Sequence, residues 1–265
     1  MIVLSNDSSN TKLAKSRGKG FKIFGLTLRA ASGSGYNMCA GSGWCEMMCV
    51  LEYAGHSNMP NVKDARDVKT RMLVEQPDLF FAYMRRDLDY IRRYMERHQC
   101  RVAIRLNVAS DQPWEIKARW IFEEYPEFQF YDYTKLPGRI KESLPSNYQL
   151  TCSYDEKTDN KWARHHLENG HNIAMVFDTW YGNKYRDPLP TEWELGGKTF
   201  DVISGDEHDL RLHEFDGHGK IIGLAGKGGT QKVLDGVSGS FIQVVPDGVL
   251  RRTARKALRS RRLSA

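Results

Sequence analysis

The chain has 265 residues, of which 40% are hydrophobic and 27% charged, the usual composition of a globular protein. No apolar run approaches the roughly 20 residues that a membrane-spanning helix needs, and the apolar N-terminal segment is too short for a secretory signal. The odd number of five cysteines argues against a disulfide framework. We therefore exclude membrane-spanning and disulfide-rich secreted proteins, and we expect a reducing cytoplasm and no membrane partner.

The net charge of +6 is unevenly distributed. Seven Arg and Lys residues follow Asp247 with no acid among them, so the rest of the chain is close to neutral. Such a tail is typical of an arm that binds nucleic acid, although a basic end can also be only a solvated segment. We expect a flexible basic lead-in at 1–20, one barrel-like catalytic domain at 21–248 and a basic tail at 249–265 that binds DNA.

Strand and helix signals then alternate along the chain. A strand is expected at 21–28, and apolar residues at three- and four-residue steps predict helices from 62 to 98, divided at Pro77. Further strands are expected at 101–108, 128–133, 148–154, 173–178, 200–203 and 220–224, and further helices at 113–125, near 140 and at 160–169. Strands separated by helices are typical of parallel sheets with right-handed crossovers. The pattern predicts an α/β fold, a single incomplete or distorted (β/α) barrel.

Three of the five cysteines, Cys39, Cys45 and Cys49, lie within eleven residues in the Gly- and Ser-rich stretch CAGSGWCEMMC. Thiolates this close together can converge on zinc or on an iron–sulfur cluster, whereas isolated cysteines are often only buried apolar residues. His56, seven residues after Cys49, is the nearest candidate for a fourth ligand. The stretch predicts a metal site at the mouth of the barrel, and zinc and a [4Fe–4S] cluster fit it equally well.

Carboxylates follow several of the expected strands. In parallel α/β folds, functional groups gather at the carboxyl ends of the strands, although a polar residue there is also ordinary loop chemistry. Asp111 and Asp178 are the candidate catalytic residues, and Asp132 and Lys135 are candidates for binding substrate. Asp155 occupies a similar position.

Two later stretches also carry polar groups. The segment 204–211 contains Asp206, Asp209 and Arg211, which suit contact with a substrate or phosphate but also suit a solvated turn. The Gly- and Lys-rich segment 223–229 could hold a phosphate, but it lacks the spacing of a Walker loop.

The cysteine stretch, with gaps of five and three residues, resembles the cysteine turn of the phage protein family called gene product 88. The segments 108–111, 130–135, 205–211 and 222–228 are similar to further motifs of that family, and the resemblance covers about residues 20–230. Two positions depart from the family pattern. Ala40 stands where the family usually has Pro, and Ala109 changes the residues before Ser110-Asp111, so details of the substrate can differ.

The resemblance implies a phage protein with a barrel-like α/β enzyme fold, acting in the cytoplasm of the host cell. Two other families are distantly similar. Radical S-adenosylmethionine enzymes have three cysteines after the first barrel strand, but at gaps of three and two residues. Guanine transglycosylases, including phage DNA enzymes that insert 7-deazaguanines, are barrels with Asp catalysis and a Cys₃His zinc site.

We therefore expect a phage DNA-modifying enzyme, with exchange of guanine for a small-molecule base as the most specific hypothesis. In that reaction Asp111 attacks the anomeric carbon of the sugar as guanine leaves, and Asp178 binds the purine, or the two roles are exchanged. The cofactor is then zinc. The alternatives are a radical enzyme with a [4Fe–4S] cluster and S-adenosylmethionine, or a metal-stabilised DNA-binding protein that assists replication.

Overall fold

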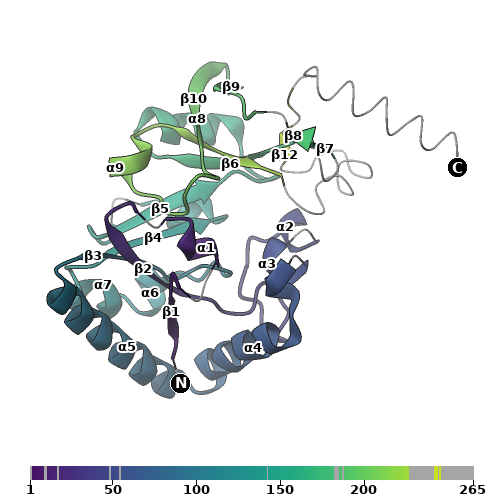
Figure 1. Cartoon of the computed structure of the whole chain (residues 1–265). Coiled ribbons are helices and arrows are strands. Elements are labelled where there is room, and N and C mark those ends of the chain that lie inside the picture. The colour runs from purple at the N-terminus through teal and green to yellow at the C-terminus, as the bar shows by residue number, and fades with distance from the viewer. Residues whose placement is uncertain are drawn as a thin grey trace, which may run out of the picture. The chain divides into compact units, whose positions relative to one another are not determined.

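The computed structural model describes residues 2–8, 11–16, 18–47, 49–53, 55–141, 143–181, 185–186, 188–226, 242–243 and 245. The chain forms two compact units. The first contains Met1–Cys152 and Glu207–Gly217, and the second contains Ser153–Asp206 and His218–Ala265. Figure 1 shows the elements of both units in chain order.

The first unit contains strands in the order β1-β2-β3-β4-β5. They are β1 (Leu4–Asn6), β2 (Phe21–Leu26), β3 (Arg101–Arg105), β4 (Gln129–Thr134) and β5 (Tyr148–Ser153). β2 to β5 are parallel, and only β1 runs antiparallel to its neighbour β2. The predicted parallel arrangement is confirmed here, and it brings the carboxyl ends of β2 to β5 to one edge.

Two long helices follow the cysteine stretch, and Pro77 divides them as predicted. The helices of this unit are α1 (Thr11–Ala14), α2 (Trp44–Met47), α3 (Val50–Tyr53), α4 (Pro60–Glu75), α5 (Pro77–His98), α6 (Trp114–Lys117), α7 (Trp120–Glu124) and α9 (His213–Asp216), with 3₁₀ turns η1 (Gly55–Asn58) and η2 (Pro137–Arg139). Pro77 is tolerated because it lies in the first turn of α5, where its missing N–H has no helical partner. The single helix expected at 113–125 is two short helices, because the backbone at Ala118 (φ −151°, ψ 54°) leaves the helical region.

Alternation along β3 and β4 separates two apolar layers. Ile104 and Phe130 pack in one layer with side chains of α5 and α7, among them Met84 and Phe122. The intervening residues point to the opposite face, where Tyr131 packs in a second layer with α1 and the segment Glu207–Gly217. The long helices therefore cover one face of these strands, and short segments cover the other.

The segment predicted as a flexible lead-in contains β1 and α1. This segment is mostly polar, but three of its apolar side chains are buried: Val3, Leu4 and Leu13. The carboxylate of Asp87 in α5 accepts hydrogen bonds from the backbone N–H groups of Val3 and Leu4 at 2.6 and 3.1 Å. These contacts anchor the start of the chain to α5.

The second unit has its own parallel strands. Its elements are α8 (Asn160–Glu168), β6 (Ile173–Phe177), β7 (Trp180–Tyr181), β8 (Tyr185–Arg186), β9 (Glu192–Leu195), β10 (Lys198–Ser204), β11 (Ile221–Ala225) and β12 (Ile242–Gln243). β6 pairs in parallel with β11 and β12, β10 pairs in parallel with β11, and β9 is antiparallel to β10. Asp159 caps the start of α8, since its side chain accepts a hydrogen bond from the N–H of Trp162.

The chain is thus a mixed α/β protein whose described strands pair mainly in parallel. The described strands of neither unit close into a barrel by themselves, and a single barrel-like domain over 21–248 stays a prediction. In the described ranges, no helix is long and apolar enough to cross a membrane.

Candidate functional site

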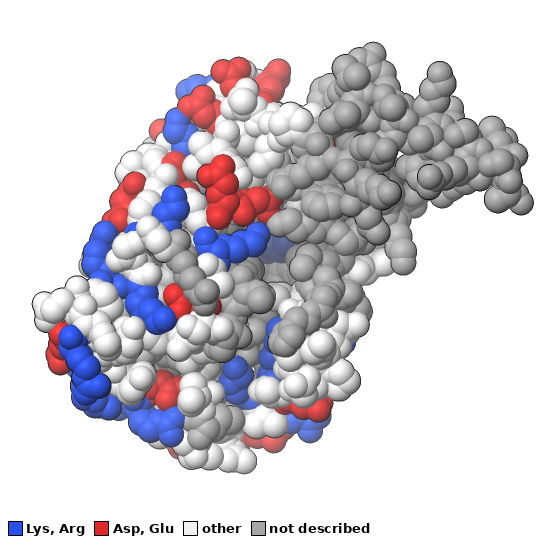
Figure 2. Space-filling model, viewed as in Figure 1, with Lys and Arg blue, Asp and Glu red and all other residues white. Residues whose placement is uncertain are grey.

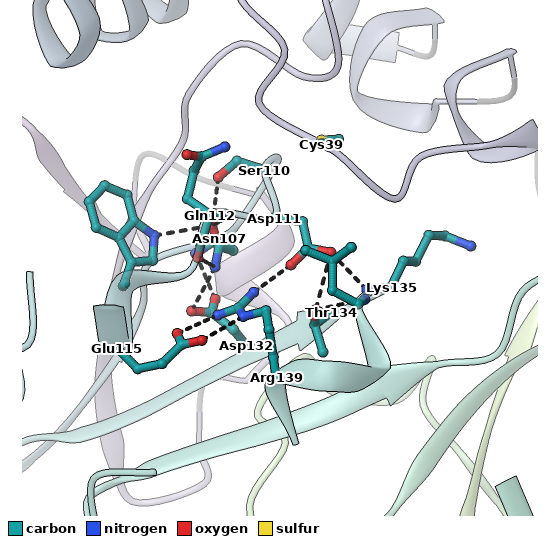
Figure 3. Close-up of polar contacts among 12 residues, drawn as sticks. Cys39, Asn107, Ser110, Asp111, Gln112, Glu115, Asp132, Thr134, Lys135 and Arg139 are labelled. Atoms are coloured by element: carbon teal, nitrogen blue, oxygen red, sulfur yellow. Dashed lines mark hydrogen bonds and ion pairs between the residues drawn. The ribbon is translucent and has the colours of Figure 1, made fainter. Parts of the chain in front are cut away.

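The cysteine loop after β2 lies directly on the loop after β3, at the carboxyl edge of the first unit (Figure 3). The backbone carbonyl of Met38 accepts hydrogen bonds from the N–H of Asp111 at 2.8 Å and from the side-chain amide of Gln112 at 2.9 Å. The Cys39 thiol lies 3.6 Å from the carbonyl oxygen of Ala109 and accepts the N–H of Ala31 at 3.4 Å. Contacts with the next strand's loop therefore fix the position of Cys39.

The same loop also contacts the end of β4. A Cβ atom added at Gly41 would lie 3.0 Å from Cβ and 3.1 Å from the carbonyl oxygen of Lys135, closer than ordinary contacts allow. A larger side chain at position 41 would require Lys135 to shift by a few tenths of an ångström. The cysteine stretch thus rests on the loops that follow two neighbouring strands.

Cys45 and Cys49 are four residues apart in the sequence. Cys45 belongs to α2, and Cys49 follows this helix, with its N–H donating to the carbonyl of Glu46 at 3.3 Å. The charge of Cys45 contributes to the raised pKa of Cys49, so the two thiols lie near each other.

The three thiols are free and half-buried. Burial is the main cause that raises the pKa of Cys39 to about 12, and the charges of Asp111, Cys49 and Cys45 add to the rise. Burial likewise raises the pKa of Cys49, and Cys45 contributes. The thiols are therefore close enough to repel one another when ionised, and Cys39 and Cys49 stay protonated at neutral pH unless a cation stabilises the thiolate.

Three thiols on one loop are the kind of donor that a thiophilic metal prefers. Within the described residues, no group of three or more His, Cys, Asp or Glu side chains is arranged to hold a metal ion. The backbone of His56 lies in η1, and its side chain is outside the described part of the chain. The metal site and its fourth ligand stay predictions.

Asp111 connects the loop after β3 to the end of β4. One carboxylate oxygen accepts a hydrogen bond from Arg139 at 2.5 Å. The other accepts the backbone N–H of Lys135 at 2.7 Å and the hydroxyl of Thr134 at 3.2 Å. Burial raises the pKa of Asp111, and the charge of Arg139 opposes this shift. At 8% exposure, Asp111 has both oxygens occupied by its own chain.

Arg139 links Asp111 to three further side chains. It donates two parallel hydrogen bonds to Glu115, at 2.8 and 2.7 Å, and a third to the Tyr148 hydroxyl at 3.1 Å. Tyr148 in turn donates to Asp132 at 3.0 Å. Asp132 is fully buried, and this burial raises its pKa to about 7.

Asn107 completes the network. Its N–H donates to Asp132 at 2.6 Å. Its side-chain carbonyl accepts from Ser110 at 2.8 Å, from the N–H of Gln112 at 2.9 Å and from the indole of Trp114 at 3.1 Å. We call this network the edge cluster, and its members are Asn107, Asp111, Glu115, Asp132, Arg139 and Tyr148.

The edge cluster contains two of the predicted site residues, Asp111 and Asp132, in one hydrogen-bonded system. Sequence reasoning missed Asn107, Glu115 and Arg139, because nothing in their local spacing indicates that they meet. Predicted Lys135 contributes its backbone N–H, and its side chain extends away from the cluster in Figure 3. The arrangement holds loops in place rather than presenting a free carboxylate.

A second set of buried polar side chains lies on the opposite face of β3 and β4. Arg105 contacts Asp209 at 2.5 Å, and its guanidinium lies 4.8 Å from the centre of the Tyr133 ring. Fully buried Arg211 donates to the carbonyl of His208 at 2.7 Å. We call this set the opposite-face cluster, and its members are Arg105, Tyr131, His208, Asp209, Arg211 and Asp216.

Charges in the opposite-face cluster are matched, but several polar atoms are not hydrogen-bonded. The closest approach of Arg211 Nε to Asp216 is 3.4 Å. Within the described chain, Arg211 Nε and Nη1, both Asp216 oxygens, Arg105 Nε and the Tyr131 hydroxyl make no hydrogen bond. Burial raises the pKa of Asp216 to about 6 and, together with the charges of Arg211 and Lys19, lowers that of His208 to about 4.

The predicted residues of the second unit lie at strand ends. Buried Asp178 follows β6, and its N–H donates to the carbonyl of Gln243 at 2.9 Å. Asp206 accepts the N–H of Ala225 at 2.8 Å and so ties the end of β10 to β11. Asp155 stabilises a turn, where it accepts from Thr158 at 2.6 Å. The catalytic and binding roles of Asp178 and Asp206 stay predictions.

Two predicted features lie outside the described residues. These are Lys227 to Gly229 of the Gly- and Lys-rich segment and the basic tail at 249–265.

The observations define a class: an α/β protein with parallel strands whose cysteine loop rests on the loops of neighbouring strands. The family model for Gene product 88 matches residues 3–242. The chain therefore belongs to the phage gene product 88 family, as its motifs predict. No curated protein matches the chain, and no solved structure does.

Proposed function

We propose that the chain is a phage enzyme that binds a [4Fe–4S] cluster through Cys39, Cys45 and Cys49 and uses S-adenosylmethionine in the host cytoplasm. One observation carries the proposal: Met38 and Cys39 are bonded to the loop after β3, at the edge where parallel α/β enzymes bind substrates. Three thiols leave one iron of a four-iron cluster without a protein ligand. Bound there, such a cluster supplies radical chemistry with S-adenosylmethionine.

The protein's own part in this proposal is to hold the cysteine loop. Asp111 and Gln112 bind the backbone of Met38, and the edge cluster holds Asp111 in place. The loop is then pre-arranged before a cluster is inserted, which reduces the ordering entropy that binding must overcome. Asp111 is thus a positioning residue.

The contacts of Asp111 favour this role over base exchange. A nucleophile must direct a free carboxylate oxygen at the sugar, whereas the oxygens of Asp111 accept from Arg139, Thr134 and Lys135. Base exchange, with zinc and with Asp178 as the remaining candidate carboxylate, is the second candidate function. Its DNA contact through the tail rests on residues beyond the described ranges.

Anaerobic purification, followed by metal analysis and a visible spectrum, tests the proposal. We expect a brown protein with about four irons per chain. Substituting Cys39, Cys45 or Cys49 by Ala should abolish the colour, whereas Cys100→Ala and Cys152→Ala are matched controls that should keep it. A colourless zinc protein would favour base exchange, and a protein without metal in all preparations would defeat both proposals.

Product analysis then separates the two reactions. The reduced protein should cleave S-adenosylmethionine, and Cys39→Ala should not. If instead labelled guanine is released from DNA in the presence of a 7-deazaguanine and without S-adenosylmethionine, base exchange is the reaction. Loss of that release in Asp178→Ala would identify the carboxylate involved.

A further inference from the structure

Helix α5 carries arginines on two different flanks. Arg85 and Arg92 form ion pairs with Glu124 and Glu127 in and after α7. The guanidinium group of Arg85 also lies over the Trp120 ring, and that of Arg92 lies over the Tyr125 ring. These arginines have partners within the fold and need no external ligand.

The neighbouring positions form a different surface. Tyr83, Arg86, Tyr90, Arg93 and Arg97 follow one another at steps of three and four residues, so they form one stripe along α5. We call it the outer stripe. Tyr90 is 58% exposed, and Arg93 and Arg97 are exposed and form no ion pair with any described residue. Figure 2 shows Lys and Arg side chains over the part of the molecule where Figure 1 places α5.

The acids of α5 neutralise this stripe only in part. Asp87 is 7% exposed, and its carboxylate accepts from the N–H groups of Val3 and Leu4 and from Arg86 at 2.7 Å. Arg86 therefore has a partner within the fold, and exposed Glu96 lies next to Arg97 in the sequence. Arg93, Arg97 and Tyr90 supply exposed cations and an aromatic ring, which are complementary to phosphates and bases.

We propose that the outer stripe binds single-stranded nucleic acid. Exposed Tyr90 lies about one turn from Arg86 on one side and from Arg93 on the other, so a base stacked on its ring has a cation near the phosphate on either side. Arg86 to Arg97 spans about 16 Å along the helix, or about five stacked nucleotides at 3.4 Å each. The site is distinct from the cysteine loop and from the tail, and it does not depend on the proposed enzyme function.

The test measures binding of a fluorescent 15-nucleotide single strand to the full chain over a range of salt concentrations. Arg93→Gln/Arg97→Gln should weaken binding and reduce the slope of log K against log salt by about 1.4, because two phosphate contacts are lost. Tyr90→Ala should weaken binding about tenfold and leave the slope unchanged. The matched control, Arg85→Gln/Arg92→Gln, removes the same charge from the other flank and should change affinity less than twofold.

The tail is present in every variant, so differences between variants report on the stripe. Equal losses in both double variants would overturn the proposal, since net charge alone would then decide binding. A silent Tyr90→Ala, or equal affinity for a duplex of the same length, would overturn the single-strand preference. Thermal unfolding checks that each variant is folded. If the control is not, Arg119→Gln/Arg164→Gln removes two charges from other exposed ion pairs.

Discussion

The edge cluster and the opposite-face cluster bury charged groups on the two faces of the same pair of strands, β3 and β4. In the edge cluster, every carboxylate receives directed hydrogen bonds, and Arg139 alone donates to three partners. In the opposite-face cluster, charges of opposite sign are close, but Arg211 and Asp216 retain atoms without a hydrogen bond. The charged side chains of both clusters are buried, so the two clusters differ in how many of their polar atoms are hydrogen-bonded.

This difference matters because a buried charge needs both an opposite charge and hydrogen bonds to offset the loss of water. The edge cluster meets both requirements, so it can hold three loops in one geometry. In the opposite-face cluster, the Arg211–Asp216 pair meets only the first requirement, so these two residues should be easier to protonate or to replace. Four predictions test this contrast.

Replacing the centre of the edge cluster should have the largest effect. Arg139→Met leaves Asp111 and Glu115 buried without their cation, and we expect the free energy of unfolding to fall by about 3–5 kcal/mol. Urea unfolding measures it. Arg119→Met, which removes an exposed pair with Glu123, is the control and should cost less than about 1 kcal/mol. A loss in Arg139→Met as small as in the control would contradict the scaffold role.

Removing the Asn107 side-chain amide should lower the free energy of unfolding somewhat less than Arg139→Met does. In Asn107→Ala, the buried donors of Ser110, Gln112 and Trp114 lose their shared acceptor, and we expect a loss of about 2–3 kcal/mol in the same assay. The control is Asn169→Ala, at an exposed position, which should change stability by about 0.5 kcal/mol or less. If water replaces Asn107 without a measurable loss, the network is less rigid than its geometry indicates.

The contributions of His208 and Asp216 to the free energy of unfolding should change between pH 7 and pH 5. With its pKa lowered from 6.5 to about 4, His208 stays neutral in the folded chain while the unfolded chain takes up a proton, so His208 destabilises the fold as pH falls. Asp216 acts oppositely: its pKa is raised from 3.8 to about 6, so the folded chain binds the proton more strongly and gains stability as pH falls.

Between pH 7 and pH 5, the free energy of unfolding of His208→Gln should therefore rise by about 2 kcal/mol relative to that of the wild type. That of Asp216→Asn should fall by about 1 kcal/mol relative to the wild type. Unfolding at the two pH values measures both. The buried carboxyl of Asp132 titrates alike in all three proteins, so it cancels in the comparison. Shifts of the same sign in the two variants would show that these groups do not titrate as their surroundings imply.

The smallest change in stability is expected when apolar side chains replace both Arg211 and Asp216, the pair that lacks hydrogen bonds. Arg211→Met/Asp216→Leu removes both charges together, and we expect stability within about 1 kcal/mol of wild type. The corresponding pair in the edge cluster, Arg139→Met/Asp111→Leu, should lose at least about 3 kcal/mol, because Glu115 and the N–H of Lys135 lose their partners. Equal losses in the two doubles would remove the distinction between the clusters.

The predicted strands are confirmed, and most of them are short apolar runs that are buried in the fold. The segments expected at 101–108 and 173–178 contain β3 and β6, for example, and both are buried almost throughout. The composition at the start of the chain does not predict β1 and α1, because only three buried apolar side chains among many polar ones anchor them. Helix 113–125 is interrupted at Ala118, and its apolar spacing does not show the interruption.

For the candidate site, position could be predicted but partners could not. The strand-end rule identified Asp111 and Asp132, because the carboxyl ends of parallel strands meet at one edge. Arg139, which holds Asp111, comes from a turn 28 residues away. Asp209 is a predicted substrate contact, a role that stays a prediction, and its partner Arg105 is 104 residues away on β3. Such pairs depend on the path of the chain, and no local spacing encodes them.

The close approach of Gly41 to Lys135 places the segment between Cys39 and Cys45 against the end of β4. Gly41 is the second of the five residues in this segment, so a larger side chain there would press on Lys135 and displace one of the two loops. The position of the first cysteine therefore depends on packing between loops that are far apart in the sequence.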